Sequence, residues 1–509
     1  MSASTEKKLR REAREAGNDK KALAAQAAAE KKAKNNRRWT LVGAGVAVLV
    51  IVALLLGSGL PYMSTAYTVG NEKFSAAEVN YHYGSQYGNF VNQYGSYASL
   101  FGLDTSNGPV NLEEQECYMT DGGSWKDYFL DSAKMAMVQT VALTDYAAEN
   151  GIALTEDEMA GVESYFAGID QAAVAYGFST ADQFFSANYG AGVDEDLVRE
   201  GYMSSALCGK VIDEMNASFT YSDAEIEEKY QSYEGEQDMF EYMYYFVAAE
   251  TSDETSEVSE EALKAAEEKA ADIVKAFADA EGEDLEAKFN DAILSVDVNG
   301  FATEQRSTGA SIIAAKEWLM DAARSEGDIT SEVNSSESGY YVMLFVERDD
   351  NHYNMANVRH ILVKAEADEN GAYTDEAKAA AKARAEEILK EFESGDKSEE
   401  SFAALAELYT EDTASAADGG LYENIAKGQM VEEFDAFCFE GHKKGDTAVV
   451  YGESSSYAGY HVMYYVGEGQ QYSDYIAELD MRNADTTEWL NELTAKYETK
   501  EGFGMRLVG

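Results

Sequence analysis

Proline, cysteine and histidine are scarce in this chain of 509 residues, which has two prolines, three cysteines and five histidines. Three cysteines, Cys117, Cys208 and Cys438, are too few for a disulfide framework, and buried thiols are favoured over a bridge between Cys117 and Cys208. No histidine pair has the HExxH spacing and no cysteine and histidine cluster exists, so a metal site is not expected. Phosphate-binding, dinucleotide and GxSxG motifs are also missing, and we expect no cofactor.

Positively charged residues are scarce after residue 38. The chain has 40 Lys+Arg against 94 Asp+Glu, a formal net charge of -54. Residues 1–38 carry 12 Lys+Arg and 5 Asp+Glu, which leaves 28 and 89 for the remainder. A body this acidic repels phosphate backbones, so nucleic-acid binding is excluded for it. Solubility is the simplest role of so much charge.

An uncharged run separates the basic tail, residues 1–38, from the acidic body. This run, WTLVGAGVAVLVIVALLLGSGL at residues 39–60, would form a helix about 33 Å long, enough to cross the core of a bilayer. Arg37 and Arg38 precede it, so the positive-inside rule predicts a single-pass protein of the cell membrane, with a cytoplasmic N-terminus and an extracytoplasmic body. The alternative is a cleaved signal peptide ending near Ala66; the long apolar stretch favours the uncleaved anchor.

Residues 67–235 follow a helical pattern after a short strand-like start. Apolar residues recur at i, i+3 and i+4, and the first long run stops at Asn150-Gly151, which is typical of a helix C-terminus. Thr155 and Glu158 predict a capping box for the next helix. The expected N-caps of two later helices are Ser179 and Ser222. We therefore expect an all-α domain here.

Residues 236–350 and 351–470 read as two copies of one unit. Each has a strand, an amphipathic helix, a mixed middle and a closing strand, GYYVMLFV in the first and GYHVMYYV in the second. The apolar positions of the two helices match at a constant offset of 115 residues: Ala266 with Ala381, Ala270 with Ala385, Ile273 with Ile388, Val274 with Leu389, and Phe277 with Phe392. This pattern predicts tandem α+β domains. The last segment, residues 471–509, is helical and is expected to dock on the helical domain.

His360 and His461 each interrupt an apolar or aromatic strand of the second copy. Alone, each is as readily a hydrogen-bonded core histidine as a functional one. The matching residues of the first copy are Tyr244 and Tyr341, so both histidines are missing there together. This joint absence favours a shared function for the pair.

The second copy resembles the parvulin-type peptidyl-prolyl isomerases. The resemblance rests on VRHILVKA, YTEDTASAADGG, KGQMVEEFDAFCF, HKKGDT and AGYHVMYYV, which keep the family's order and spacing over residues 355–469. It implies that the catalytic residues are His360, Asp412 and His461, and that the proline ring binds against Leu421, Met430 and Phe434. GGLYENI, residues 419–425, departs from the family's GGDLGxF, which affects the wall near Leu421.

Such residue types suit rotation about an X-Pro bond. The barrier is about 18–20 kcal/mol because of amide resonance. An apolar pocket that dries the carbonyl removes hydrogen bonds that favour the planar amide, and paired histidines with a nearby aspartate can fix the polarity around the twisting bond. No nucleophile is required.

The helical region together with the repeats resembles exported foldases of the PrsA and SurA type, through YTVGNEKFSAAEVN, AAENGIALTEDEM and FTYSDAEIEEKY. The resemblance implies an all-α chaperone-like domain, two tandem α+β parvulin-like domains and an N-terminal transmembrane helix. It also implies a membrane-anchored extracytoplasmic foldase, active on X-Pro bonds, whose partners are unfolded or newly exported polypeptides. The alternatives are a holdase chaperone without significant isomerase activity, and a surface adhesin or scaffold.

Overall fold

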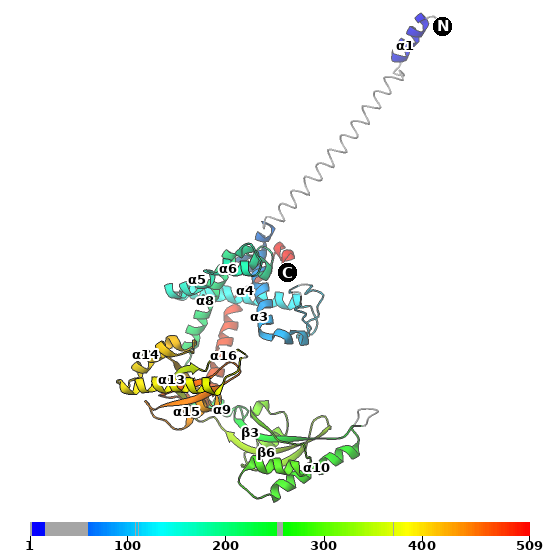
Figure 1. Ribbon diagram of the computed structural model, residues 1–509. Helices are drawn as coiled ribbons and strands as arrows, with labels where there is room; N and C mark the ends of the chain where they lie inside the picture. Colours follow the sequence, from blue (N-terminus) through cyan, green and yellow to red (C-terminus); the bar gives the residue numbers. More distant parts are fainter. Residues whose placement is uncertain (1–2, 16–59, 107, 110, 252–257, 370) are drawn as a thin grey trace. The chain divides into compact units, whose positions relative to one another are not determined.

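The computed structural model describes residues 3–15, 60–106, 108–109, 111–251, 258–369 and 371–509 (Figure 1). Contacts divide the chain into unit 1, residues 1–219 with 485–509, and unit 2, residues 220–484. The expected anchor, residues 39–60, lies outside the described residues apart from Leu60. Within the described ranges, no helix is both long and apolar enough to cross a membrane.

Unit 1 is mainly helical. Its helices are α3 (Ala76–Tyr94), α4 (Trp125–Asn150), α5 (Glu156–Phe166), α6 (Ile169–Ala175), α7 (Ala181–Tyr189) and α8 (Glu195–Ser218). It also holds a three-stranded antiparallel sheet in the order β11 (Thr499–Glu501), β1 (Thr65–Val69) and β2 (Glu72–Ser75). The expectation of an all-α domain is therefore wrong in this respect. Strand β1 buries Ala66, Tyr67 and Val69 against α3 and α4, which is why the small sheet belongs to the helical core.

The helix ends of unit 1 follow the predicted caps with one exception. The predicted capping box of Thr155 and Glu158 is present, and α4 ends at Gly151 in the left-handed conformation, where glycine meets no steric penalty. Helix α7 is capped by Thr180, whose side chain accepts from the backbone N–H of Gln183. Ser179 was expected in this role, and that prediction is wrong by one residue.

The boundaries of unit 1 differ from those expected. They fall at 219/220 and 484/485, whereas the sequence predicted 235/236 and 470/471. Residues 220–235 belong to unit 2 because α9 (Asp223–Gln231) packs Ile226 and Tyr230 against Ala477 of α16 (Tyr472–Thr494). The end of α16 belongs to unit 1, where Leu493 packs with Ala142 and Leu143. The predicted docking of the C-terminal segment is thus confirmed for residues 485–509.

Unit 2 contains two four-stranded antiparallel sheets. The first sheet domain, residues 236–350, has the strand order β4-β3-β6-β5 and the second, residues 351–470, has the order β8-β7-β10-β9. The strands of the first are β3 (Met239–Ala248), β4 (Thr303–Thr308), β5 (Ile329–Val333) and β6 (Gly339–Asp349). The strands of the second are β7 (Asn354–Lys364), β8 (Leu421–Ile425), β9 (Thr447–Glu453) and β10 (Ala458–Gln471). The predicted α+β class is confirmed for both sheet domains.

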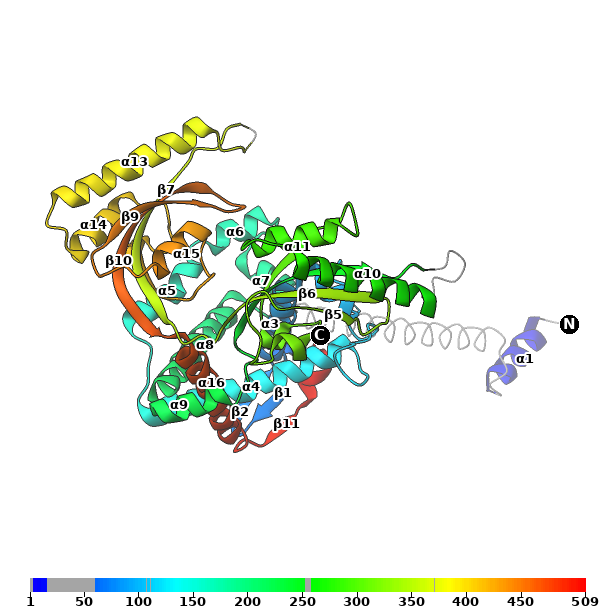
Figure 2. The same cartoon turned by 90° about the horizontal axis from the view of Figure 1, so that it is seen from below.

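Helices cover both faces of each sheet. In the second sheet domain, α13 (Asp375–Ser394) and α14 (Glu399–Tyr409) lie on one face and α15 (Glu432–Phe439) on the other (Figure 2). The first sheet domain repeats this with α10 (Glu260–Asp279) and α11 (Leu285–Leu294) opposite the short α12 (Lys316–Leu319). Four of the matched helix positions are buried in both copies: Ala266, Ala270, Ile273 and Phe277 in α10, and Ala381, Ala385, Ile388 and Phe392 in α13. The 115-residue offset is therefore an offset between equivalent core residues.

Candidate active site

The two central strands of the second sheet place His360 and His461 side by side. In the antiparallel register His360 of β7 pairs with Met463, and His461 of β10 pairs with Leu362. The imidazoles project from the α15 face and are only 4% and 3% exposed. Their Nδ1 atoms lie 2.9 Å apart and their rings are stacked with centroids at 5.1 Å. Two histidines far apart in the sequence thus form one buried pair.

Asp412 continues this pair into a hydrogen-bonded chain. His360 Nε2 lies 3.0 Å from Asp412 Oδ2, and the same oxygen accepts from Ser415 Oγ at 2.6 Å and from the Tyr422 hydroxyl at 3.1 Å. At the other end, the Tyr457 hydroxyl lies 3.0 Å from His461 Nε2. The predicted trio His360, Asp412 and His461 therefore meets in space.

The Asp412 carboxylate sets the direction of the hydrogen bonds that link Asp412, His360, His461 and Tyr457. A carboxylate only accepts, so His360 donates from Nε2, and in its neutral form it presents an unprotonated Nδ1. His461 must then donate from its own Nδ1 and accept from the Tyr457 hydroxyl at Nε2. Both imidazoles are satisfied in the neutral form, each as a single defined tautomer.

The electrostatics agree with this arrangement. The hydrogen bond from His360, aided by those from Ser415 and the backbone N–H of Ala414, holds the pKa of Asp412 well below its usual range. Burial, with a smaller contribution from His360, lowers the pKa of His461 to about 3. At neutral pH the site thus holds one carboxylate and an uncharged His461.

An apolar wall faces the imidazoles. Phe434 of α15 is 2% exposed and meets both rings edge-on, with centroids 5.4 Å from His360 and 5.2 Å from His461. Met430, just before α15, packs on the same core cluster. Binding of a proline ring against Met430 and Phe434 stays a prediction.

Leu421 does not lie on this face. It pairs with Arg359 in the β7 and β8 register, whereas Tyr422 pairs with Val358. Because side chains alternate along a strand, Leu421 shares the face of Arg359, opposite His360. The prediction that Leu421 lines the pocket is wrong by one residue, and Tyr422 stands in its place, with its ring 5.2 Å from His360.

A glycine makes room for the His461 ring. Gly452 of β9 lies beside it, and a Cβ at this position would stand 2.6 Å from His461 Nε2 and 3.0 Å from Val431. Real Cβ atoms do not approach so closely. The imidazole therefore occupies the space that the missing side chain leaves.

The sequence reasoning missed four contributors: Ser415, Tyr422, Gly452 and Tyr457. The sequence carried a signal for Tyr457. Side chains alternate between the two faces of a strand, and Tyr457 lies directly before β10, four residues before His461, so both are expected on the same face. Tyr422 and Gly452 are identified only by the pairing register of their strands, and Ser415 only by the turn after α14. The three cysteines are all free, as expected, with Cys117 and Cys438 buried and Cys208 partly buried.

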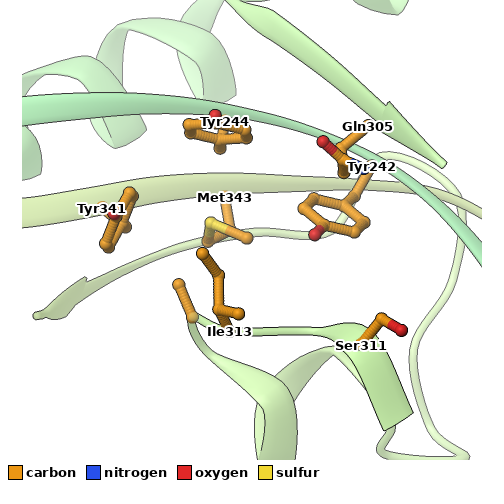
Figure 3. A pocket seen from close by; sticks show the side chains of 8 residues that line it. Tyr242, Tyr244, Gln305, Ser311, Ile313, Tyr341 and Met343 are labelled. Atoms are coloured by element: carbon orange, nitrogen blue, oxygen red, sulfur yellow. The ribbon is translucent and has the colours of Figure 1, made fainter. Parts of the chain in front are cut away.

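The first sheet domain has the same register without the histidines. Tyr244 pairs with Met343, as His360 pairs with Met463, and Tyr341 pairs with Phe246, as His461 pairs with Leu362. The strand positions of the histidine pair are thus occupied by two tyrosines (Figure 3).

Comparison with known proteins places the second sheet domain in a family. Residues 340–465 match the model of the PPIC-type PPIase domain, that is, a peptidyl-prolyl isomerase domain. The chain is also 27% identical over 258 residues to the chaperone SurA of Alkalilimnicola ehrlichii, an alignment that covers 50% of this chain and 56% of that protein. The chain therefore spans little more than half the length of this curated relative.

Solved structures of PrsA are also similar to parts of the chain. PrsA of Bacillus subtilis is 13% identical, covering 74% of this chain and 89% of that chain, with a TM-score of 0.29. The peptidylprolyl isomerase PrsA of Bacillus anthracis is 20% identical, covering 29% and 59%, with a TM-score of 0.19. The buried histidine pair thus lies within the residues that match the PPIC-type peptidyl-prolyl isomerase domain, in a chain that is similar to the chaperone SurA.

Proposed function

We propose that this chain is a membrane-anchored extracytoplasmic foldase whose second sheet domain catalyses cis/trans isomerisation of X-Pro bonds. The observation that carries the proposal is the buried chain of Tyr457, His461, His360 and Asp412 beneath Phe434. Its members need no metal or nucleophile to act on an amide that only has to rotate.

The geometry suits a twisting amide in two ways. The planar amide places partial negative charge on its oxygen, and the twisted amide loses that polarity. A proline ring held against Phe434 and Met430 brings its amide into an apolar environment, which disfavours the polar planar form. The fixed carboxylate of Asp412 acts in the same direction, because negative charge nearby opposes negative charge on the oxygen.

The histidines position these groups and keep the site ordered. His360 is fixed by hydrogen bonds at both nitrogens, and so is His461. Pre-organised polar groups need no rearrangement as the bond rotates, which is the condition for electrostatic stabilisation of a transition state.

His461→Ala in the full chain tests the isomerase activity. We expect kcat/KM on a proline-containing test peptide to fall at least tenfold, about 1.4 kcal/mol of barrier. His352→Ala, the same change at a histidine outside the pocket, serves as the control and should keep full activity. Rates at the uncatalysed background for the unmodified chain and both variants would favour the holdase alternative, and full activity in His461→Ala would contradict the assigned site.

Client binding is the second part of the proposal. Unit 1 has a hollow of about 920 Å³ whose lining includes Tyr81, Tyr87, Tyr165, Tyr189 and Tyr202. Tyrosine offers a large, stiff apolar surface with a polar end, which suits binding of extended chains of varied sequence. A holdase without isomerase activity would use this surface alone.

A carboxylate placed in the hollow tests client binding. Gly88 lines the hollow within α3, and a Cβ there would meet nothing within 4 Å. Gly88→Glu should weaken suppression of aggregation of an unfolded client protein severalfold. Gly161→Glu, in the open on α5, is the matched control. If the two variants protect the client equally, the hollow does not bind it.

The proposed anchor rests on the uncharged run at residues 39–60 and the basic residues before it. Protease treatment of intact cells should digest the body and spare a fragment of about 60 residues, which is the length of the tail and anchor. A body that stays intact until the cells are lysed would contradict the extracytoplasmic location.

A further inference from the structure

Two short 3₁₀ helices meet at the start of unit 1. They are η1 (Leu60–Met63), which leads into β1, and η5 (Phe503–Leu507), which follows β11. Because β11 is antiparallel to β1, the chain after β11 runs back past the residues before β1 (Figure 1). Gly504 is buried against these residues, and a Cβ on it would stand 2.4 Å from the carbonyl oxygen of Ser64. The two helices are therefore neighbours in the fold.

Large apolar side chains are exposed where these helices meet. Met63 is 73% exposed and Phe503 is 71% exposed, although each is one residue from the contact between Gly504 and Ser64. The Arg506 guanidinium lies 5.3 Å from the centroid of the Phe503 ring, and among the described residues it forms no ion pair. We refer to Met63, Phe503 and Arg506 as the junction patch. Aromatic and apolar groups beside a cation are typical of protein surfaces that lie in the interface of a bilayer.

The chain around the junction patch contains no acidic side chain. Residues 60–71 and 502–509 hold Arg506 and no Asp or Glu, whereas residues 72–219 and 485–501, the rest of unit 1 after residue 60, hold 7 Lys+Arg and 28 Asp+Glu. A bilayer with anionic lipids attracts cations and repels carboxylates within about one Debye length, which is about 8 Å at physiological salt. Within unit 1, the junction is therefore the region that such a surface repels least.

The spacing along the chain limits how far the junction patch is from the proposed anchor. The uncharged run ends at residue 60, and η1 extends from there to Met63. A 3₁₀ helix rises about 2.0 Å per residue, so Met63 lies within about 6 Å of the end of the run. The headgroup layer on each side of the hydrocarbon core is about 5–7 Å thick. An anchor that spans the bilayer thus holds the patch at the level of the headgroups.

We infer that the junction patch is a second membrane contact, at which Met63 and Phe503 enter the headgroup layer of an anionic bilayer and Arg506 binds lipid phosphate. The inference rests on the proposed anchor, which brings the patch to the bilayer. A guanidinium suits this role because its planar fork of donors matches phosphate oxygens. Since Phe503 and Arg506 belong to the C-terminal segment, the contact holds the folded unit against the membrane at a second point.

Benzoylphenylalanine in place of Phe503 tests the contact in the full chain. The chain is reconstituted in vesicles of phosphatidylcholine and phosphatidylglycerol, and irradiation links the probe to the molecule that it touches. We expect capture of phospholipid at least fivefold above that of the same probe in place of Tyr118. Tyr118 is a matched control, because it is 66% exposed in unit 1 but lies in an acidic stretch, residues 113–121, without Lys or Arg. Equal lipid capture at both positions, or capture of a second copy of the chain instead of lipid, would overturn the inference.

Arg506→Glu tests the role of lipid charge. With the probe at position 503, this change should lower lipid capture at least fivefold in the mixed vesicles and less than twofold in vesicles of phosphatidylcholine alone. An equal loss in both kinds of vesicle would refute the binding of anionic lipid by Arg506.

Alkaline extraction of the same vesicles separates this inference from the proposed anchor. A chain that stays in the membrane while the probe at position 503 captures no lipid would overturn the junction patch alone. A chain that alkali releases would contradict the anchor itself.

Discussion

Gly452 and His461 show how one missing side chain decides the position of another. The imidazole fills space that a Cβ at residue 452 would take, and the His461 ring is in turn fixed by hydrogen bonds at both nitrogens. A clash here cannot be relieved by small movements, because the ring would have to break one of those bonds. The space and the hydrogen bonds therefore act together on His461.

A double-mutant cycle tests this coupling. Gly452→Ala alone should lower isomerase turnover at least tenfold and destabilise the second sheet domain by about 1–3 kcal/mol, as overpacking does. In a His461→Ala background the same change should cost much less, because the clashing ring is gone. Stability is measured by hydrogen exchange of β9 and β10 amides in the full chain. Additive effects would show that Gly452 does not act through His461.

The low pKa of His461 predicts how stability depends on pH. Unfolded, this histidine takes up a proton near pH 6.5, whereas in the fold it stays neutral down to about pH 3. Between these values the unfolded state binds the extra proton, so the stability contributed above pH 6.5 is lost as the pH falls. The expected loss is about 1.4 kcal/mol per pH unit.

Hydrogen exchange of β7 and β10 between pH 7 and pH 5, corrected for intrinsic exchange rates, measures this dependence. His461→Phe keeps a buried ring and removes the titrating group, so its stability should change less over the same range. An equally steep dependence in His461→Phe would assign the effect to other groups.

Helices and strands were predictable to different degrees. The 115-residue offset identified the buried positions of α10 and α13, because helical periodicity is a local property of the sequence. Strand partners are not local. The face of the sheet on which Leu421 lies depends on its pairing with Arg359. A shift of one residue in this register would place Leu421, instead of Tyr422, on the face of His360. Strand β11 consists of three polar, exposed residues, so it carries no periodic signal and is defined only by its pairing with β1.

Helix α7 offers a test of capping at the level of one element. Thr180→Ala removes the side-chain oxygen that accepts from Gln183 N–H and should destabilise the helix by about 1 kcal/mol. Ser179→Ala is the control, because only the backbone N–H of Ser179 is used, in a bond to the Gln183 side chain. Exchange rates of α7 amides report the difference. Greater exchange in Ser179→Ala than in Thr180→Ala would restore Ser179 as the cap.

The chain leaves unit 1 at residue 219 and returns to it at residue 485. Unit 1 is therefore built from two separate segments of the sequence. They meet where β11 pairs with β1 and where Val508 is buried in the cluster around β1, α3 and α4. Unit 2 is a continuous insertion, whose sheets are complete without residues from outside it. This topology makes the stability of unit 1, rather than that of the isomerase domain, depend on the C-terminus.

Removal of residues 496–509 tests that dependence. The deletion takes away β11 and Val508, exposes one edge of β1 and uncovers apolar surface, so unit 1 should become more susceptible to proteolysis within residues 60–219. Isomerase turnover on a short peptide should persist, because the histidine pair, Asp412 and Phe434 all lie within unit 2. Lys500→Ala, a change on an exposed β11 residue, controls for altered surface charge. Loss of turnover with unit 1 still resistant would mean that the C-terminus supports the isomerase domain instead.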